Sequence, residues 1–506
     1  MDILYSLTAT ILFVYCLKLL ARRKRLPLPP GPKPTWIIGN LRDMPKAKAW
    51  ITFSRWSQDY QSGIIYFSLV GQGFLVVNQM KAASELLETR ASNYSDRPQS
   101  TMNALMGWDF SVALMPYGDL WRSRRKVFNQ HFRKDAVKTY EPIQEARIHG
   151  FLKDLLQEPG EFRNHIQILT ATITTASIYG RDVHSMEDPY VKLVDEAVSM
   201  LANSMFPTAL LVNAVPILKH LPAWFPGAGF KRYANKCKVL TERMQNEPLE
   251  EVKLLKDKGV AQPCLTTALL EENEASGGSQ PGEETLRAVV ATVYSGAADT
   301  TFSSISTAFN CLATHPDVVA KARSEIYSVV GKDRLPQLRD RPSLPYLEAV
   351  YREVMRFYPV LPFSIRRVME DDVYDGYSIP KGTIVIGNIW GISHDPLAYD
   401  NPNDFRPERF LDATGHLNND EKVVAFGFGR RICVGQHFAS STTWLTLACV
   451  IALFDFLPMK DDNGLDIPVR AEYTDEFIAH PKEFKCSIIP CSKEAERLIA
   501  ETYNGF

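Results

Sequence analysis

The chain has 506 residues, of which 45% are hydrophobic and 23% charged, as in an ordinary globular protein. The formal net charge of −1 gives no electrostatic case for a nucleic-acid-binding protein. The eight cysteines are scattered without a C-x-x-C pair, which argues against a zinc module and against a disulfide-linked secreted domain.

The beginning of the chain is predicted to be a membrane anchor. Residues 3–20 are apolar apart from a few hydroxyl side chains and Lys18, which is about the length that crosses a bilayer. Four basic residues follow at 22–25, and positive charge on that flank keeps the rest of the chain in the cytosol. A cleaved secretory signal fits less well, because Asp2 lies where a base is expected and no small-residue cleavage site follows.

The rest of the chain is divided by composition. A basic and proline-rich linker is expected at residues 22–45, between a transmembrane anchor at residues 1–21 and one large domain at residues 46–506. Residues 63–78 have two β-branched and aromatic runs around Gly71-Gln72-Gly73, which predicts a hairpin. Helical spacing of apolar residues then dominates. The predicted helices include residues 141–156, 189–202, 231–256, 283–314, 344–358 and 436–454. The fold class is therefore mainly α with a small β region.

The long helix at residues 283–314 is apolar on most sides, so we expect it to be buried in the middle of the domain. It nevertheless carries Asp299 and Thr300 at its centre. Thr300 can donate to the carbonyl of Gly296, four residues earlier, and open a local notch for dioxygen and water, while Asp299 supplies protons. The alternative is a satisfied helix kink without a catalytic role, which would be favoured if no cofactor ligand lay elsewhere in the chain.

Cys433 is the candidate for such a ligand. It stands in Phe-Gly-Phe-Gly-Arg-Arg-Ile-Cys-Val-Gly at residues 426–435, just before the predicted helix 436–454. Glycines permit tight turns and close approach of a flat ligand, and a helix N-terminus favours a charged sulfur. A single thiolate suits haem iron, where it promotes O–O cleavage. The alternative is a buried and inert cysteine.

This segment matches the F-x-x-G-x-R-x-C-x-G signature, and the sequence thereby resembles the cytochrome P450 superfamily, most of all its fungal microsomal members of secondary metabolism. Further matches extend over nearly the whole chain. Residues 296–301 resemble the A/G-G-x-D/E-T-T motif, with Ala297 in place of the usual glycine. Trp121 and Arg125 match W-x-x-x-R, and Glu353 and Arg356 match E-x-x-R.

The resemblance implies a role for each matched residue. Cys433 is expected to be the axial ligand of haem b. The remaining cofactor-binding residues are expected to be Trp121, Arg125, Arg367 and Arg431, which hold the propionates, together with Phe426, Gly429 and Gly435. Phe426 is expected to pack beside the sulfur, and Gly429 to let backbone amides point at it. Asp299 and Thr300 are expected to be catalytic, and Glu353, Arg356 and Arg409 to form one buried network beneath the haem.

The resemblance also implies a reaction and its partners. The expected activity is monooxygenation of a lipophilic small molecule, such as a terpenoid, polyketide or aromatic secondary metabolite. Electrons would come from NADPH through a separate NADPH-cytochrome reductase, because the chain has no phosphate-cradling glycine fingerprint. Cytochrome b5 is a further candidate partner, and the expected location is the endoplasmic reticulum membrane with a single span and a cytosolic catalytic domain.

Several questions stay open at this stage. The bases Arg122, Arg124 and Lys126 are either ordinary solvated charges or a docking face for an acidic reductase. The apolar segments 210–212 and 221–226 either face the core or dip into a membrane. Two other classes of function remain: a haem-thiolate isomerase or dehydratase that needs no external electrons, and a non-enzymatic haem-binding membrane protein.

Overall fold

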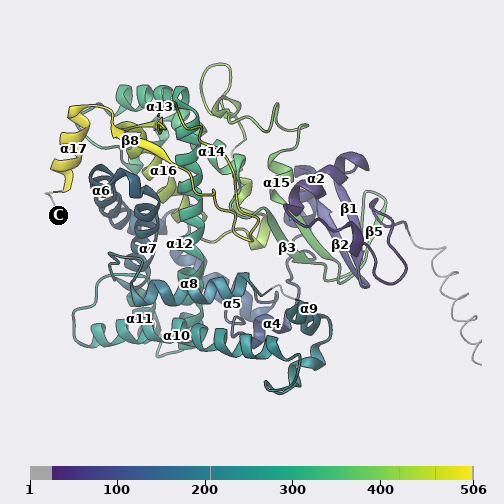
Figure 1. Ribbon diagram of the computed structural model, residues 1–506. Coiled ribbons are helices and arrows are strands. Elements are labelled where there is room, and N and C mark those ends of the chain that lie inside the picture. Colours follow the sequence, from purple (N-terminus) through teal and green to yellow (C-terminus); the bar gives the residue numbers. More distant parts are fainter. Residues whose placement is uncertain (1–25, 205–206, 421, 462, 504–506) are drawn as a thin grey trace, which may run out of the picture.

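The computed structural model describes residues 26–204, 207–420, 422–461 and 463–503. It is mainly helical with small sheets, as predicted (Figure 1). The α-helices are α2 (Ala49–Asp59), α3 (Met80–Ala83), α4 (Thr101–Leu105), α5 (Asp119–Phe132), α6 (Glu141–Gln157), α7 (Phe162–Tyr179), α8 (Pro189–Ala202), α9 (Pro207–Ala214), α10 (Gly229–Asp257), α11 (Leu265–Ala275), α12 (Glu283–Thr314), α13 (Pro316–Val329), α14 (Pro345–Phe357), α15 (Ile389–Ser393), α16 (Gln436–Leu453) and α17 (Lys493–Tyr503). The strands are β1 (Ile64–Leu69), β2 (Gln72–Val77), β3 (Phe363–Arg367), β4 (Asp372–Tyr374), β5 (Tyr377–Ile379), β6 (Ile384–Asn388), β7 (Phe454–Pro458) and β8 (Cys486–Pro490).

The largest sheet lies at one side of the molecule, away from most of the long helices (Figure 1). Its strand order is β1-β2-β6-β3. Strands β1 and β2 form the predicted antiparallel hairpin, which turns at Val70 and Gly71 with positive φ angles of 48° and 84°. Strand β6 then pairs parallel to β2 and antiparallel to β3, so residues some 300 positions apart in the chain become neighbours.

The helix α12 runs through the helical body, where it packs against α7 and α16 (Figure 1). Its observed bounds, Glu283–Thr314, agree with the predicted ones. The stretch from Thr301 to Ala313 is buried on all sides, while Gly296 is exposed and Ala297 to Thr300 are half-buried. The middle of a central helix is thus left accessible at the segment that carries Asp299 and Thr300.

The proline-rich segment before the first helix lies against the sheet region. The Tyr66 amide donates to the Pro30 carbonyl, and the Ser378 amide donates to the Pro27 carbonyl. The predicted anchor at residues 1–21 lies outside the described residues. Within residues 26–503, where placed, there is no helix whose length and apolar character together would let it cross a membrane.

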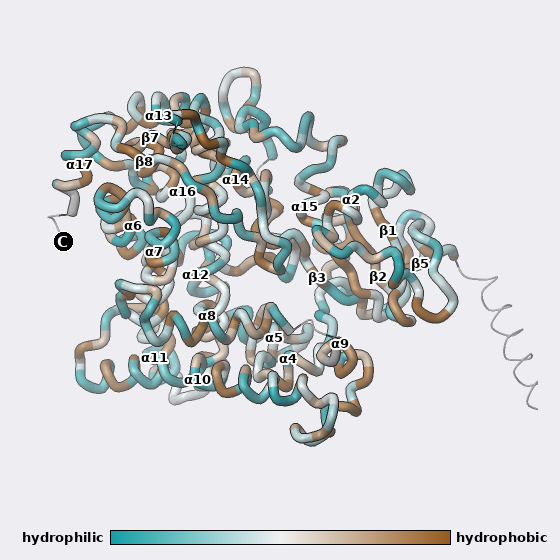
Figure 2. The backbone as a smooth tube through the Cα atoms, in the orientation of Figure 1, coloured by the Kyte–Doolittle hydropathy of each residue, from teal (hydrophilic) through white to brown (hydrophobic). Residues whose placement is uncertain are grey.

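Two apolar segments that the sequence left ambiguous are partly at the surface. On α9, Leu210 and Leu211 are exposed whereas Val212 is buried. Further along, Trp224 is 79% exposed and Phe225 41%. Figure 2 shows brown, hydrophobic residues in and near α9, whereas the neighbouring α10 carries many teal, hydrophilic residues. The core-facing interpretation therefore does not hold for these four exposed side chains.

Candidate functional site

The loop before α16 is folded back on itself. The Cys433 amide donates to the Phe426 carbonyl at 2.8 Å, which closes the turn. Gly427 and Gly429 have positive φ angles of 79° and 51°. A Cβ atom on Gly429 would also lie 2.1 Å from the Leu87 carbonyl oxygen, so only glycine fits there. The signature glycine thus lets the loop before α16 lie close against the backbone of Leu87 and Glu88, just after α3.

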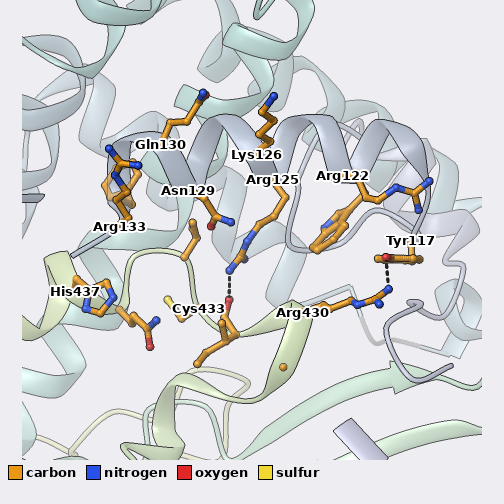
Figure 3. Close-up of a pocket in the computed structure, with 16 residues that line it drawn as sticks. Tyr117, Arg122, Arg125, Lys126, Asn129, Gln130, Arg133, Arg430, Cys433 and His437 are labelled. Carbon is orange, nitrogen blue, oxygen red and sulfur yellow. Dashed lines mark hydrogen bonds between the residues drawn. The ribbon is translucent and has the colours of Figure 1, made fainter. Parts of the chain in front are cut away.

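The side chain of Cys433 is exposed toward a cavity of about 710 Å³ between this loop and α5 (Figure 3). Trp121, Arg125 and Gly429 line the same cavity, so the structure brings these predicted residues together with Cys433. Arg125 reaches down from α5 and donates to the Ile432 carbonyl at 2.8 Å (Figure 3). The space beside the sulfur is therefore walled by a helix, an arginine and a glycine-rich turn.

Two groups beside the Cys433 thiol stabilise its charged form. Desolvation by the surrounding protein raises the thiol pKa, and the Gly435 amide and the Arg125 charge oppose that rise. A metal ligand must be deprotonated, so a bound cation would have to supply the remaining stabilisation.

Four arginines converge beside this loop: Arg97, Arg125, Arg366 and Arg431. They donate mainly to backbone carbonyls. Arg431 donates to the carbonyls of Ser95, Val112 and Met115 at 2.8, 3.2 and 3.0 Å. Arg366 donates to the Phe428 carbonyl, and Arg97 to the carbonyls of Ala113 and Ile365. Neutral carbonyls therefore satisfy their hydrogen bonds without balancing their charge.

The electrostatics of this arginine cluster indicate a missing anion. Burial lowers the pKa of Arg431 to about 9 and that of Arg97 to about 10, and for Arg431 the neighbouring guanidiniums add to this effect. The pKa of Arg366 falls well below its ordinary value through desolvation and the charges of the other three arginines. The charge of Asp96 partly offsets the lowering of the pKa for Arg97 and for Arg431, but not for Arg366. A group with two carboxylates would offset these charges, which fits the propionates of a haem.

The structure does not bring Arg367 into this cluster. Neighbouring residues of a strand point to opposite faces, and in β3 it is Arg366 that is 2% exposed and joined to the other arginines. Arg367 is half-buried, and its backbone pairs with Asp96. Of this pair, Arg366 is thus the residue whose charge belongs to the arginine cluster.

Trp121 and Arg431 support one another. The Trp121 Nε1 donates to the Val112 carbonyl at 3.1 Å, and the Arg431 guanidinium lies 4.3 Å from the centre of the Trp121 ring. A cation over an indole face is a favourable contact in a desolvated site. The predicted tryptophan therefore orients an arginine of the cluster.

Asp299 and Thr300 lie on α12 and are not part of the cavity between α5 and the Cys433 loop. The Thr300 hydroxyl donates to the Gly296 carbonyl at 2.8 Å, which confirms the contact predicted from the sequence. The Asp299 carboxylate lies 3.4 Å from the Nε2 atom of His480, a residue that the sequence did not single out. Nearby Asp195 on α8 has its pKa raised to about 6 by burial and by the Asp299 charge.

The predicted network of Glu353, Arg356 and Arg409 is confirmed. Glu353 is fully buried and accepts from Arg356 at 2.6 and 2.8 Å and from Arg409 at 3.1 Å. The Arg406 amide donates to the same carboxylate at 2.7 Å. Two of these four hydrogen bonds lie within α14, and the other two tie α14 to the loop around residues 402–410.

One basic residue was misplaced by the sequence argument. Arg124 is 3% exposed and donates to Glu284 at 2.7 Å, so it does not belong to a surface docking face. Arg122 and Lys126 are exposed, and Lys126 points away from the Cys433 loop (Figure 3).

The sequence analysis did not identify Arg97 as a site residue, because an Asp-Arg-Pro tripeptide carries no local signal of a binding site.

Comparisons with known proteins place the chain as a whole in one family. The family model described as Cytochrome P450 matches residues 29–488. A cytochrome P450 monooxygenase of Rhodocybe pseudopiperita, ple1, is 40% identical over 483 residues, covering 94% of this chain and 92% of the relative. The claR monooxygenase of Ampulloclitocybe clavipes is 37% identical, covering 94% and 89%. The tryptamine 4-monooxygenase of Psilocybe cyanescens is 35% identical, covering 95% and 96%.

The mainly helical fold and the match over residues 29–488 define the class of protein, one whose family implies a haem cofactor. The chain belongs to the cytochrome P450 family, whose members named here are monooxygenases and therefore oxidoreductases.

Proposed function

We propose that this chain inserts one oxygen atom from dioxygen into a lipophilic small molecule, with haem b as its cofactor. The observation that carries the proposal is an accessible Cys433 beside a cluster of four arginines, of which Arg366 and Arg431 are buried. The thiolate is a soft ligand suited to iron, and propionates are the carboxylates that such a cluster accepts. When bound there, haem activates dioxygen, so that one oxygen atom enters the substrate and the other leaves as water.

The residues around the loop would bind and orient this group. Cys433 would ligate iron, and the Gly435 amide would stabilise the sulfur charge. Arg97, Arg125, Arg366 and Arg431 would hold the propionates, while Phe426 and Gly429 keep the loop in its turn. The fixed loop prevents the sulfur from moving relative to the arginines.

Asp299 and Thr300 would manage protons on the other side of the site. Because the Thr300 hydroxyl hydrogen is directed to the Gly296 carbonyl, its oxygen is free to accept a hydrogen bond from water. The Asp299 carboxylate is 42% exposed one residue away and can exchange protons with that water. Such a pair is not needed for a reaction without external electrons, which favours the monooxygenase over an isomerase or dehydratase.

Electrons would come from NADPH through a separate membrane-bound reductase, with cytochrome b5 as a second donor. Arg122, Lys126 and Arg133 are exposed on and after α5, next to the cavity that holds Cys433. A basic face mainly speeds the encounter with an acidic partner. The electron donor would thus approach from the cysteine side of the site.

The substrate is proposed to be lipophilic, and the protein to lie on the endoplasmic reticulum membrane. The resemblance to the family makes residues 102–115 a wall of the substrate pocket, and Met102, Met106 and Met115 in this segment are buried. Membrane attachment through residues 1–21 would agree with the exposed apolar residues near α9 and with Trp36, which is 96% exposed. Since a relative is named for tryptamine, aromatic amines belong among the candidates together with terpenoids and polyketides.

The test is to incubate the full-length protein with a reductase, NADPH and ¹⁸O₂. The compounds supplied are those terpenoids, polyketides and indoles that shift its haem spectrum on binding. We expect one ¹⁸O atom per product and strict dependence on NADPH. Unlabelled product formed without NADPH would instead support the isomerase or dehydratase. A haem spectrum that no compound shifts would support the non-enzymatic haem-binding protein.

A further inference from the structure

A loop near the end of the chain is fastened across the middle of α12. Within this loop, the Thr474 amide donates to the His480 carbonyl at 2.9 Å, and the His480 amide donates to the Thr474 hydroxyl at 3.1 Å. Tyr473 and Pro481 form a β-bridge at its base. These contacts close the loop on itself, so the backbone position of His480 is fixed before its side chain contacts anything else.

The loop meets α12 at three successive points of one helix face. The Ser303 hydroxyl donates to the Ala479 carbonyl, and the His480 ring lies 5.6 Å from the ring of Phe302. One turn earlier, His480 Nε2 lies 3.4 Å from the Asp299 carboxylate. The imidazole is therefore held between an aromatic ring and the carboxylate that the oxygen-activation motif provides.

The surroundings indicate why Asp299 needs such a partner. A second carboxylate, Asp195 on α8, is close enough for the Asp299 charge to act on it. Two carboxylates repel each other, and the Asp299 side chain is 42% exposed, so a hydrogen-bond donor beside it stabilises one direction of the carboxylate. His480 is only 13% exposed, and its Nδ1 atom is buried without a hydrogen-bond partner in the described part of the chain. The polar contact of the His480 ring is thus made by its Nε2 atom, and the partner is the Asp299 carboxylate.

We propose that His480 is a positioning residue that holds the Asp299 carboxylate in the orientation from which it supplies protons at Thr300. The inference rests on the proposed function, since it assigns a role within the same site. A merely structural role would depend on the ring packing against Phe302. A positioning role depends on the Nε2 donor. The two roles can therefore be separated by substitutions at one position.

Two variants serve as controls for each other. His480→Phe keeps an aromatic ring on Phe302 but removes the donor, while His480→Gln keeps an N–H group at a similar reach but removes the ring. Each variant is combined with a reductase, NADPH and dioxygen without any substrate, and the consumed NADPH and dioxygen and the released hydrogen peroxide are measured. Release of peroxide uses one NADPH per dioxygen, whereas complete reduction to two waters uses two and needs the additional protons.

If His480 positions Asp299, His480→Phe releases a several-fold larger share of the dioxygen as peroxide, and His480→Gln restores most of the wild-type share. The double variant with both Asp299→Asn and His480→Phe then has the same peroxide share and the same thermal midpoint as Asp299→Asn alone. The two substitutions are not additive because both remove one contact. An unchanged share in His480→Phe, or equal losses in the Phe and Gln variants, would overturn the proposal. So would additive thermal shifts of Asp299→Asn and His480→Phe.

The carbon monoxide difference spectrum of each variant separates this inference from the proposed function. A thiolate spectrum in all variants with unchanged peroxide release would refute the role of His480 alone. A wild-type protein without the thiolate spectrum would refute the proposed function, and the inference with it.

Discussion

Replacing Glu353 with alanine is expected to lower the free energy of unfolding by about 3–5 kcal/mol, because it leaves two buried arginines without their counter-charge. Glu353 is fully buried, and the side chains of Arg356 and Arg409 are each 4% exposed. Both guanidiniums would then face backbone carbonyls alone, as for Arg356 with Ser393 and Pro402. Chemical denaturation of the purified protein, followed by tryptophan fluorescence, measures the loss.

Glu247→Ala provides the matched control for this prediction. Glu247 also pairs with an arginine on its own helix, Arg243 at 2.7 Å, but the two side chains are 40% and 51% exposed. An exposed pair of this kind contributes less than about 1 kcal/mol. Equal losses in Glu353→Ala and Glu247→Ala would show that the buried network does not hold α14 to the loop after it.

Replacing Arg366 with methionine is expected to weaken haem retention by roughly 10–100-fold, the usual effect of removing a supporting partner of a bound cofactor or metal. Arg366 is buried beside three other arginines, and in the proposed site a propionate would offset its charge. Methionine has a similar length and removes the charge. The rate at which haem passes from the protein to an excess of apomyoglobin measures the effect.

Arg367→Met is the control in the neighbouring position. Arg367 lies on the opposite face of β3, outside the arginine cluster, so its haem loss is expected to match that of the wild type. If Arg367→Met lost haem faster than Arg366→Met, the residue expected from the sequence would be the propionate ligand after all, and the assignment to Arg366 would be wrong.

Local patterns explain what could be predicted from the sequence. The helix α12 is bounded by Gly282 and by His315-Pro316, so its ends follow from glycine and proline chemistry. The hairpin at residues 63–78 follows from a turn between two β-branched runs. Thr300 and Gly296 meet because residues four apart share a helix face.

Features that depend on contacts between distant segments could not be predicted in this way. The choice between Arg366 and Arg367 depends on how β3 pairs with β6, and a shift by one residue would exchange their faces. Arg97 joins the cluster from a loop with no motif of its own, and His480 reaches Asp299 from 181 positions away in the chain. The raised pKa of the Cys433 thiol likewise depends on how deeply the folded protein encloses the sulfur.

The most direct test of the account is the carbon monoxide difference spectrum of the reduced protein, with Cys433→Ala as its control. If Cys433 ligates iron as a thiolate, the wild type shows the long-wavelength Soret band from which the cytochrome P450 family takes its name, and Cys433→Ala lacks it. A wild-type band at the shorter wavelength of a neutral ligand, or a long-wavelength band that survives in Cys433→Ala, would contradict the central assignment.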